Sequence, residues 1–136
     1  MAQTPEGRVK TRAKKIYDAR GAKYDRAAAT GMGKNGRPDD LVRRRPDGHF
    51  LGGEAKKEAV FDVTLLQKIW LEDCADGGGS SMVVNMTNLD LRDKVLATPG
   101  CRIVASFEDL KVGARCTGHT VYLGEQARWI PSKPEK

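Results

Sequence analysis

The chain has 136 residues, of which 39% are apolar and 31% are charged, and its formal net charge is +6. This composition is typical of one globular domain, and three cysteines without a CxxC pair exclude a disulfide scaffold and favour free thiols. The chain contains no apolar run near the ~18 residues of a membrane span and no apolar secretory segment at its N-terminus. We therefore expect a cytoplasmic protein without a membrane partner.

Caps and turns divide the chain into helices and strands. Thr4 followed by Pro5 predicts a helix that begins there and ends at Gly21. A turn at residues 46–48 predicts a hairpin, and Thr64 opens a second helix with an apolar stripe. The stripe consists of Leu65, Leu66, Ile69, Trp70 and Cys74. The expected elements are helices at 5–20, 64–76 and 88–97, strands at 22–29, 39–45, 49–57, 81–85, 101–107 and around 120–123, and a disordered tail from residue 130.

This order predicts an α/β fold with a mixed central β-sheet flanked by helices. The first four strands form the sheet, with strand 81–85 parallel to the hairpin because a helix connects them. We expect a single domain over 1–136, with a core at about 4–86, an extension at 87–130 to which the sequence assigns no role, and a tail at 131–136. The glycine-rich loop TGMGKNG lacks the GxxxxGK[ST] order, so no nucleotide cofactor is expected.

Positive charge is concentrated in the first part of the chain. Residues 1–57 contain 15 Lys and Arg against 7 Asp and Glu, whereas residues 58–136 contain 9 against 11. A one-sided positive field attracts polyanions, and nucleic acid is the first candidate, ahead of a membrane surface or an acidic protein. The alternative interpretation is a basic face that is simply solvated.

The predicted hairpin brings acids and a lysine together. Glu54 and Lys56 share one face of their strand, and the turn register decides whether Asp39 or Asp40 joins them. Two carboxylates repel each other unless a cation lies between them. With the backbone carbonyl of Ala55 and waters, they suit Mg²⁺, for which Mn²⁺ can substitute, and Lys56 would orient a water or offset charge on a phosphate. The alternative interpretation is a cross-strand ion pair on an exposed hairpin.

The order of these motifs resembles that of the PD-(D/E)xK nucleases, in particular the VRR-NUC group, which is related to Holliday-junction resolvases. The family pattern is a glutamate in the first helix, a Gly-x-Pro-Asp strand start, a Glu-x-Lys strand end, and a glutamine in the next helix before a glycine and a last strand. The matching segments are Glu6 in PEGRV, Gly36 to Asp39, Glu54 to Lys56, Gln67 in TLLQKIW, and DGGGSSMVVN. Asp40 after the Pro-Asp pair and the glycines at 52 and 53, which suggest a bulge, depart from the pattern.

The resemblance implies a restriction-endonuclease-like core and a Mg²⁺-dependent DNA endonuclease, acting as a homodimer on branched or junction DNA, like a stand-alone phage-type enzyme. The implied catalytic residues are Asp39, Glu54, Lys56, Glu6 and Gln67, and the implied metal ligands are Asp39, Glu54, the Ala55 carbonyl and Glu6. The candidates for nucleic-acid binding are Lys34, Arg37, Arg43, Arg44 and Lys57.

Several alternatives to these assignments stay open. Gln67 also completes a capping box with Thr64. Arg43 and Arg44 could instead flank a hairpin tip in solvent, and Lys57 could be a surface charge. The alternatives to a structure-specific enzyme are a sequence-specific restriction-type nuclease, a non-catalytic DNA-binding or inhibitory protein, and an RNA-directed nuclease.

Overall fold

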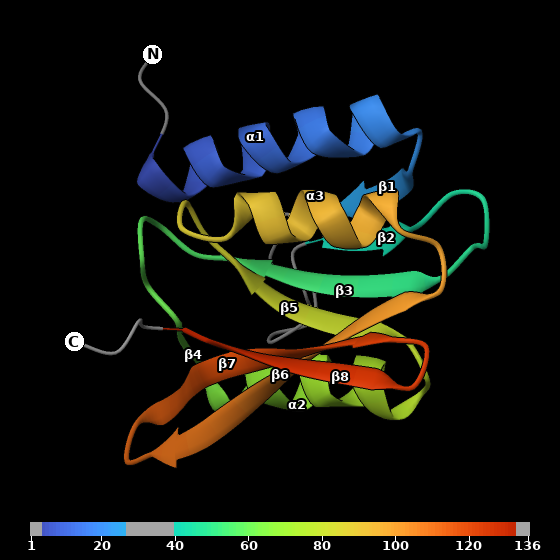
Figure 1. The fold of residues 1–136 in the computed structure, drawn as a ribbon. Coiled ribbons are helices and arrows are strands. Elements are labelled where there is room, and N and C mark those ends of the chain that lie inside the picture. Colours follow the sequence, from blue (N-terminus) through green and yellow to red (C-terminus); the bar gives the residue numbers. More distant parts are fainter. Residues whose placement is uncertain (1–3, 27–39, 133–136) are drawn as a thin grey trace.

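The computed structural model describes residues 4–26 and 40–132, and within them the first sheet has the strand order β1-β2-β3-β5 (Figure 1). β1 and β2 each pair antiparallel with the next strand along the chain, and β5 lies parallel to β3. These strands are β1 (Lys23–Arg26), β2 (Asp40–Arg43), β3 (Phe50–Ala55) and β5 (Ser80–Val84). The predicted mixed sheet and its parallel last strand are therefore confirmed.

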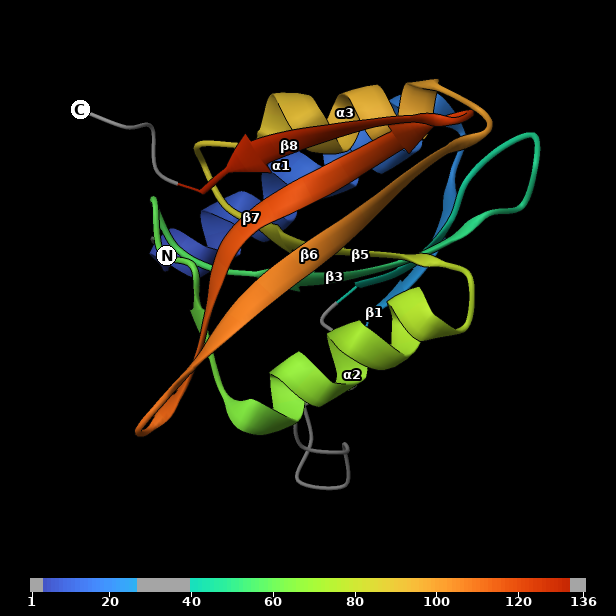
Figure 2. The same ribbon diagram turned by 60° about the horizontal axis from the view of Figure 1, so that its bottom comes forward.

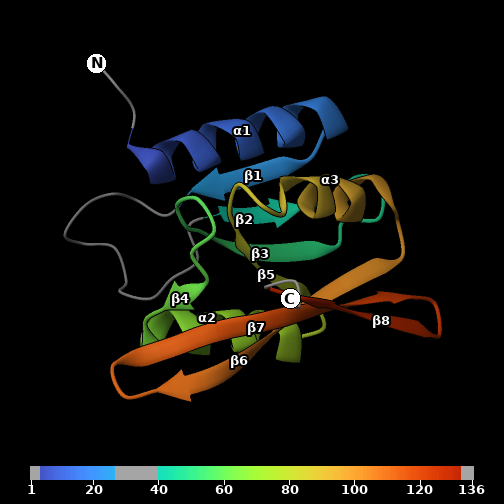
Figure 3. The same ribbon diagram turned by 60° about the vertical axis from the view of Figure 1, so that its left-hand side comes forward.

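Three helices flank this sheet. They are α1 (Pro5–Arg20), α2 (Leu65–Asp76) and α3 (Leu89–Ala97). Figures 1 and 3 show α1 and α3 on one face of the sheet and α2 on the other. The predicted caps of α1 are present, because the Thr4 side chain accepts a hydrogen bond from the Gly7 amide at 3.0 Å and Gly21 adopts a left-handed φ of 67°.

A second sheet, which the sequence analysis did not predict as a unit, lies on the α2 side of the first. It consists of β4 (Asp62–Val63), β6 (Cys101–Leu110), β7 (Gly113–Leu123) and β8 (Gln126–Pro131), with β7 paired to each of the other three. Figure 2 shows β6, β7 and β8 as long strands running side by side. The expected disordered tail is wrong for residues 130 and 131, which lie in β8, and residues 133–136 lie outside the described residues.

Two buried serines join the two sheets. The Ser80 hydroxyl accepts a hydrogen bond from the Ile103 amide at 3.0 Å, and the Ser81 hydroxyl accepts one from the Ala105 amide at 3.1 Å. Both side chains are fully buried. These hydroxyls accept from β6 amides that would otherwise donate to backbone carbonyls of a neighbouring strand. β6 therefore lies beside β5 without becoming a strand of the first sheet.

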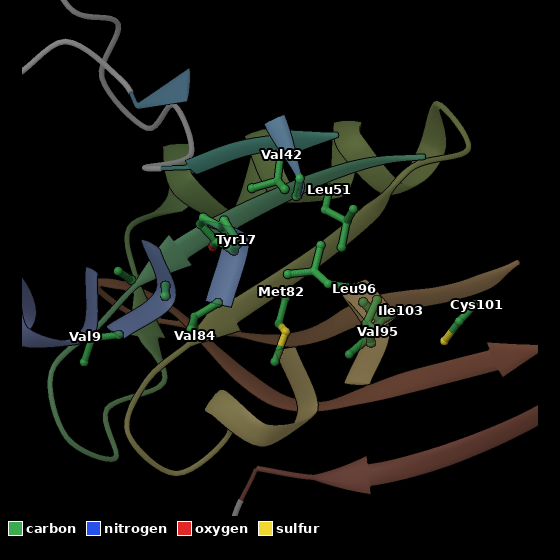
Figure 4. Close-up of a cluster of buried hydrophobic side chains, with 13 residues drawn as sticks. Val9, Tyr17, Val42, Leu51, Met82, Val84, Val95, Leu96, Cys101 and Ile103 are labelled. Carbon is green, nitrogen blue, oxygen red and sulfur yellow. The ribbon is translucent and has the colours of Figure 1, made fainter. Parts of the chain in front are cut away.

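The main core includes residues of the C-terminal extension (Figure 4). Val9 and Tyr17 of α1 pack in one cluster with Leu51 of β3, Val95 of α3 and Ile103 of β6. All five side chains are fully buried. Residues after position 87 therefore form part of the same hydrophobic core as the first sheet.

The predicted helix at 64–76 is confirmed, but much of its predicted apolar stripe faces solvent instead of the sheet. Leu65, Leu66 and Ile69 are about half exposed, whereas Leu71 and Ala75 are buried. Leu71 belongs to an apolar cluster with Val83 of β5, and Gln67 of the same helix contacts Lys56 at the end of β3. No helix among the described residues is long and apolar enough to cross a membrane.

Candidate functional site

The candidate site lies where β3 ends, on the face of the sheet that α2 covers. Glu54 pairs with Val83 of β5, so both side chains share the face on which Val83 packs against Leu71 of α2. Glu54 is only 2% exposed. Lys56 follows two residues later and is partly exposed. A buried carboxylate and a lysine at the rim therefore lie at one end of this face.

Gln67 of α2 contacts Lys56. Its Oε1 atom accepts a hydrogen bond from the Lys56 ammonium at 3.1 Å and another from the Thr64 amide at 2.9 Å. The Thr64 hydroxyl in turn accepts from the Gln67 amide at 3.1 Å, which completes the capping box. The two predicted roles of Gln67 therefore coexist, since one oxygen both caps α2 and fixes the ammonium of Lys56.

Asp40 does not join Glu54. It pairs with Gly53 in the β2–β3 ladder, so its side chain lies on the opposite face of the sheet from Glu54. There its carboxylate accepts a 2.9 Å hydrogen bond from the Tyr17 hydroxyl and is 3% exposed. The register that would deliver Asp40 to the site is thus wrong. Asp39, Lys34 and Arg37 lie outside the described residues.

A buried arginine that the sequence analysis missed completes this opposite face. Arg92 of α3 is fully buried, and its Nε donates to the Tyr17 hydroxyl at 3.2 Å. Its two terminal nitrogens have no hydrogen-bond partner within the described residues. Burial raises the pKa of Tyr17 to about 12, so the hydroxyl keeps the proton that it donates to Asp40. The resulting Arg92–Tyr17–Asp40 chain links α3, α1 and the start of β2.

Arg92 also explains the glycine at position 53. A Cβ atom at Gly53 would lie 2.7 Å from the Arg92 Nη2 atom, closer than any real contact of that kind. The ladders on both sides of β3 run through Gly53 without a shift, so the bulge suggested by the paired glycines is wrong. No pattern in the sequence connects positions 53 and 92, because they meet only in the folded chain.

Glu6 lies in the first turn of α1 as predicted, but its side chain is 44% exposed and its Oε2 atom lies 3.5 Å from the Lys10 ammonium. α1 begins at the end of the molecule where β3 ends (Figures 1 and 3). In the described part of the chain, the ion pair of Glu6 is with Lys10. Glu6 therefore lies at the end of the molecule where β3 ends, paired with Lys10, and its role at the site stays a prediction.

The prediction that Arg44 binds nucleic acid is wrong, and so is the alternative that it lies in solvent. Its guanidinium is buried and donates to Asp47 at 3.0 and 2.6 Å and to the carbonyls of Val95 and Cys101 at 3.2 and 2.6 Å. Four of its five N–H donors are therefore used inside the protein. Arg43 is exposed and contacts the Asp25 carboxylate at 3.2 Å, while Lys57 is exposed beside Lys56.

Among the described residues, no group of three or more His, Cys, Asp and Glu side chains is arranged to hold a metal ion. Two predicted ligands are adjacent on β3, the Glu54 carboxylate and the Ala55 carbonyl, and both present the hard oxygen donors that Mg²⁺ prefers. The described residues thus supply part of an oxygen-ligand set, and the rest of the predicted set depends on Asp39 and Glu6.

Cys116 and His119 form a second cluster of side chains, and their environment indicates a structural role rather than a catalytic one. The His119 Nε2 atom lies 3.8 Å from the Cys116 sulfur and accepts from the Val83 amide at 3.2 Å. Burial lowers the pKa of His119 to about 4 and raises that of Cys116 to about 11. Both groups are therefore neutral near pH 7, and the thiol is not activated as a nucleophile.

None of the family models, curated proteins or solved structures compared with this chain matches it. The resemblance to PD-(D/E)xK nucleases therefore depends on the order of motifs in the sequence. What the structure adds is the position of Glu54, Lys56 and Gln67 at one end of one face of a mixed sheet.

Proposed function

We propose that the protein is a Mg²⁺-dependent DNA endonuclease with a PD-(D/E)xK core, acting as a homodimer on branched or junction DNA. The observation that carries this proposal is the contact between Lys56 and Gln67 beside the buried Glu54. Two of the five motif elements, the Glu54 to Lys56 strand end and Gln67 of the next helix, meet at one end of β3. The antiparallel β1-β2-β3 meander followed by a parallel β5 also supports such a core.

The metal would be held by the Glu54 carboxylate and the Ala55 carbonyl, with Asp39 as the second carboxylate and Glu6 as an additional ligand. Mn²⁺ would substitute for Mg²⁺, since both take oxygen ligands. When bound, the ion supplies polarisation of the phosphodiester and a water of lowered pKa. The burial of Glu54 keeps competing water away from its carboxylate and strengthens its attraction for a cation.

Lys56 would orient the attacking water or stabilise charge on the phosphate. An ammonium group has three N–H donors, and Gln67 accepts from one of them. Because Gln67 is itself fixed by the capping box of α2, the lysine is held at the rim of the site rather than left to rotate in solvent. Two donors can then serve a water and a phosphate oxygen.

Cleavage of a DNA panel tests the proposal. The panel contains labelled linear duplex, single strand, flap and four-way junction, each with Mg²⁺, Mn²⁺ or EDTA. Glu54→Gln removes the charge of the proposed ligand, and Glu58→Gln is the matched control, because it makes the same change at an exposed position of the following turn.

We expect metal-dependent cleavage of the junction by the wild type and by Glu58→Gln, with a loss of at least 100-fold in Glu54→Gln. Fixed-length fragments from linear duplex would instead indicate a sequence-specific enzyme. DNA binding without cleavage of any member, in either metal, would refute the nuclease and favour a protein that acts by occupying DNA.

A further inference from the structure

The solvent face of α1 carries a stripe of positive charge, formed by Arg8, Arg12 and Lys15. All three side chains are exposed, while Val9, Ala13 and Tyr17 bury the opposite side of the helix. At 3.6 residues per turn the three cations fall within an arc of about 60°, and they span about 10 Å along the axis. We call these three residues the α1 stripe.

Several basic residues elsewhere on the described surface are paired with acids, whereas others, such as Lys23, Arg45 and Lys57, are exposed without an ion pair among the described residues. Arg20 binds Asp93 at 2.8 Å, and Arg43 binds Asp25 at 3.2 Å. On the α2 side of the molecule, Lys68 contacts Glu72 and Asp109, and Arg115 contacts Asp62 and Glu108.

The α1 stripe differs from these paired cations, because within residues 4–26 and 40–132 none of its members forms an ion pair. Three like charges on one helix face repel one another by a few tenths of a kcal/mol per pair. A helix that keeps three such cations on one face presents a positive field to whatever approaches from solvent.

The spacing of the stripe fits a DNA backbone. Phosphates rise about 3.4 Å each along one strand, so about 10 Å of helix covers about three phosphates. The stripe begins with Arg8 in the second turn of α1, at the end of the molecule where β3 ends with Glu54 and Ala55 (Figures 1 and 3). DNA bound along the stripe would therefore reach this end of the molecule, where the candidate site lies on the other side of the sheet.

We infer that the α1 stripe is a DNA-binding surface that contacts the phosphate backbone at the end of the molecule that carries the candidate site. The identity of the polyanion as DNA rests on the proposed function. The stripe would make the phosphate contacts that the sequence analysis assigned to Arg44, because the structure shows that Arg44 is buried. Phosphate contacts of this kind set affinity and orientation rather than sequence preference.

The test is the salt dependence of DNA binding in EDTA, which separates binding from cleavage. The affinity for a labelled duplex and a four-way junction is measured from 50 to 300 mM KCl by fluorescence anisotropy. The stripe variant is Arg8→Gln, Arg12→Gln, Lys15→Gln. The matched control, Lys94→Gln, Lys111→Gln, Arg128→Gln, removes the same charge from exposed positions on other elements. Thermal melts confirm that both variants fold.

We expect the slope of log K against log salt to be shallower by about 2 to 3 in the stripe variant, at about 0.9 per lost phosphate contact. Its affinity at 100 mM KCl should fall at least tenfold, while the control changes less than threefold. Restoring the charges as Arg8→Lys, Arg12→Lys, Lys15→Arg should restore the slope.

Equal slopes in the stripe and control variants, with wild-type binding intact, would overturn this inference and leave the proposed function standing. A wild type that binds neither DNA at any salt would refute the proposed function itself. Stripe-dependent binding to vesicles of phosphatidylserine and phosphatidylcholine, with DNA binding unchanged in the stripe variant, would assign the surface to a membrane and also overturn the inference.

Discussion

Asp47→Asn should destabilise the protein, because Asp47 is the carboxylate partner of a buried arginine. Asp47 accepts two hydrogen bonds from the buried Arg44, at 3.0 and 2.6 Å, and others from the amides of His49 and Gly100, at 3.2 and 3.1 Å. Arg44 in turn donates to Val95 and Cys101. This ion pair therefore fastens the hairpin to the end of α3 and the start of β6.

The expected magnitude follows from the exposure of the two partners. The Arg44 side chain is 1% exposed and that of Asp47 is 32% exposed, so solvent screens one side of the pair. Breaking a fully buried pair costs about 3–5 kcal/mol, and partial exposure reduces this to about 2–3 kcal/mol. With an unfolding entropy of about 2.1 cal/mol/K per residue, 136 residues give a fall in melting temperature of roughly 7–10 °C.

The pH dependence gives a sharper test. Hydrogen bonds from Arg44 hold the pKa of Asp47 well below its ordinary value. A carboxylate with a depressed folded-state pKa stabilises the fold above its unfolded pKa of about 3.9, and this contribution is lost as the pH falls toward the folded value. The difference in unfolding free energy between wild type and Asp47→Asn should be constant from pH 7 to about pH 5 and should shrink below pH 4.

Urea denaturation followed by tryptophan fluorescence at pH 7, 5, 4 and 3 measures this difference. Asp25→Asn is the control, because Asp25 makes one 3.2 Å contact with Arg43 and its side chain is 67% exposed. We expect that variant to lose less than about 0.5 kcal/mol. Equal losses in the two variants, or a loss in Asp47→Asn that does not change down to pH 3, would refute the reasoning.

Three further predictions concern the buried Tyr17, the buried His119 and the proposed catalytic Lys56. Tyr17→Phe should lower the free energy of unfolding by about 1–3 kcal/mol in urea denaturation, because it leaves the buried Asp40 and Arg92 without their shared hydroxyl. His119 has a folded pKa of about 4, below its ordinary value, so the free energy of unfolding should fall as the pH drops from about 6.5 to 4, and His119→Gln should flatten that part of the profile. Lys56→Met should abolish metal-dependent cleavage while anisotropy in EDTA shows unchanged DNA affinity, and reduced binding would mean that Lys56 holds substrate instead.

The local part of the fold could be predicted from the sequence. Thr4 and Gly21 mark the ends of α1 because capping depends on a few neighbouring residues, and the structure contains both caps. The three helices and the strands of the first sheet follow from similar local signals. The Glu54 to Gln67 part of the site could be predicted for the same reason, since strand alternation and a capping box are local patterns.

The parts that could not be predicted depend on contacts between distant positions. Arg44 has the same sequence context as the exposed Arg43, and only the carbonyls of Val95 and Cys101, more than fifty residues away, make it a buried anchor. β4 has two residues and forms only by pairing with β7, so it carries no periodic signal of its own. The predicted stripe of α2 follows from apolar residues at helical spacing, but the structure buries Leu71 and Ala75 instead, because contacts with distant strands decide which side of the helix faces the sheet.

One strand therefore serves two purposes through adjacent residues. Gly53 leaves room on the α1 and α3 face for the guanidinium of Arg92, which donates to the tyrosine that holds Asp40 at the start of β2. Glu54, the next residue, points to the α2 face and the candidate site. A buried guanidinium is costly when its terminal nitrogens have no hydrogen-bond partner among the described residues, and α3 supplies Arg92 on the other face of the strand that carries the proposed metal ligand. The C-terminal extension thus stabilises this end of the sheet from its other face, and a chain truncated at residue 86 would retain the motifs but lose Arg92 and the side chains of α3 and β6 that pack in the core.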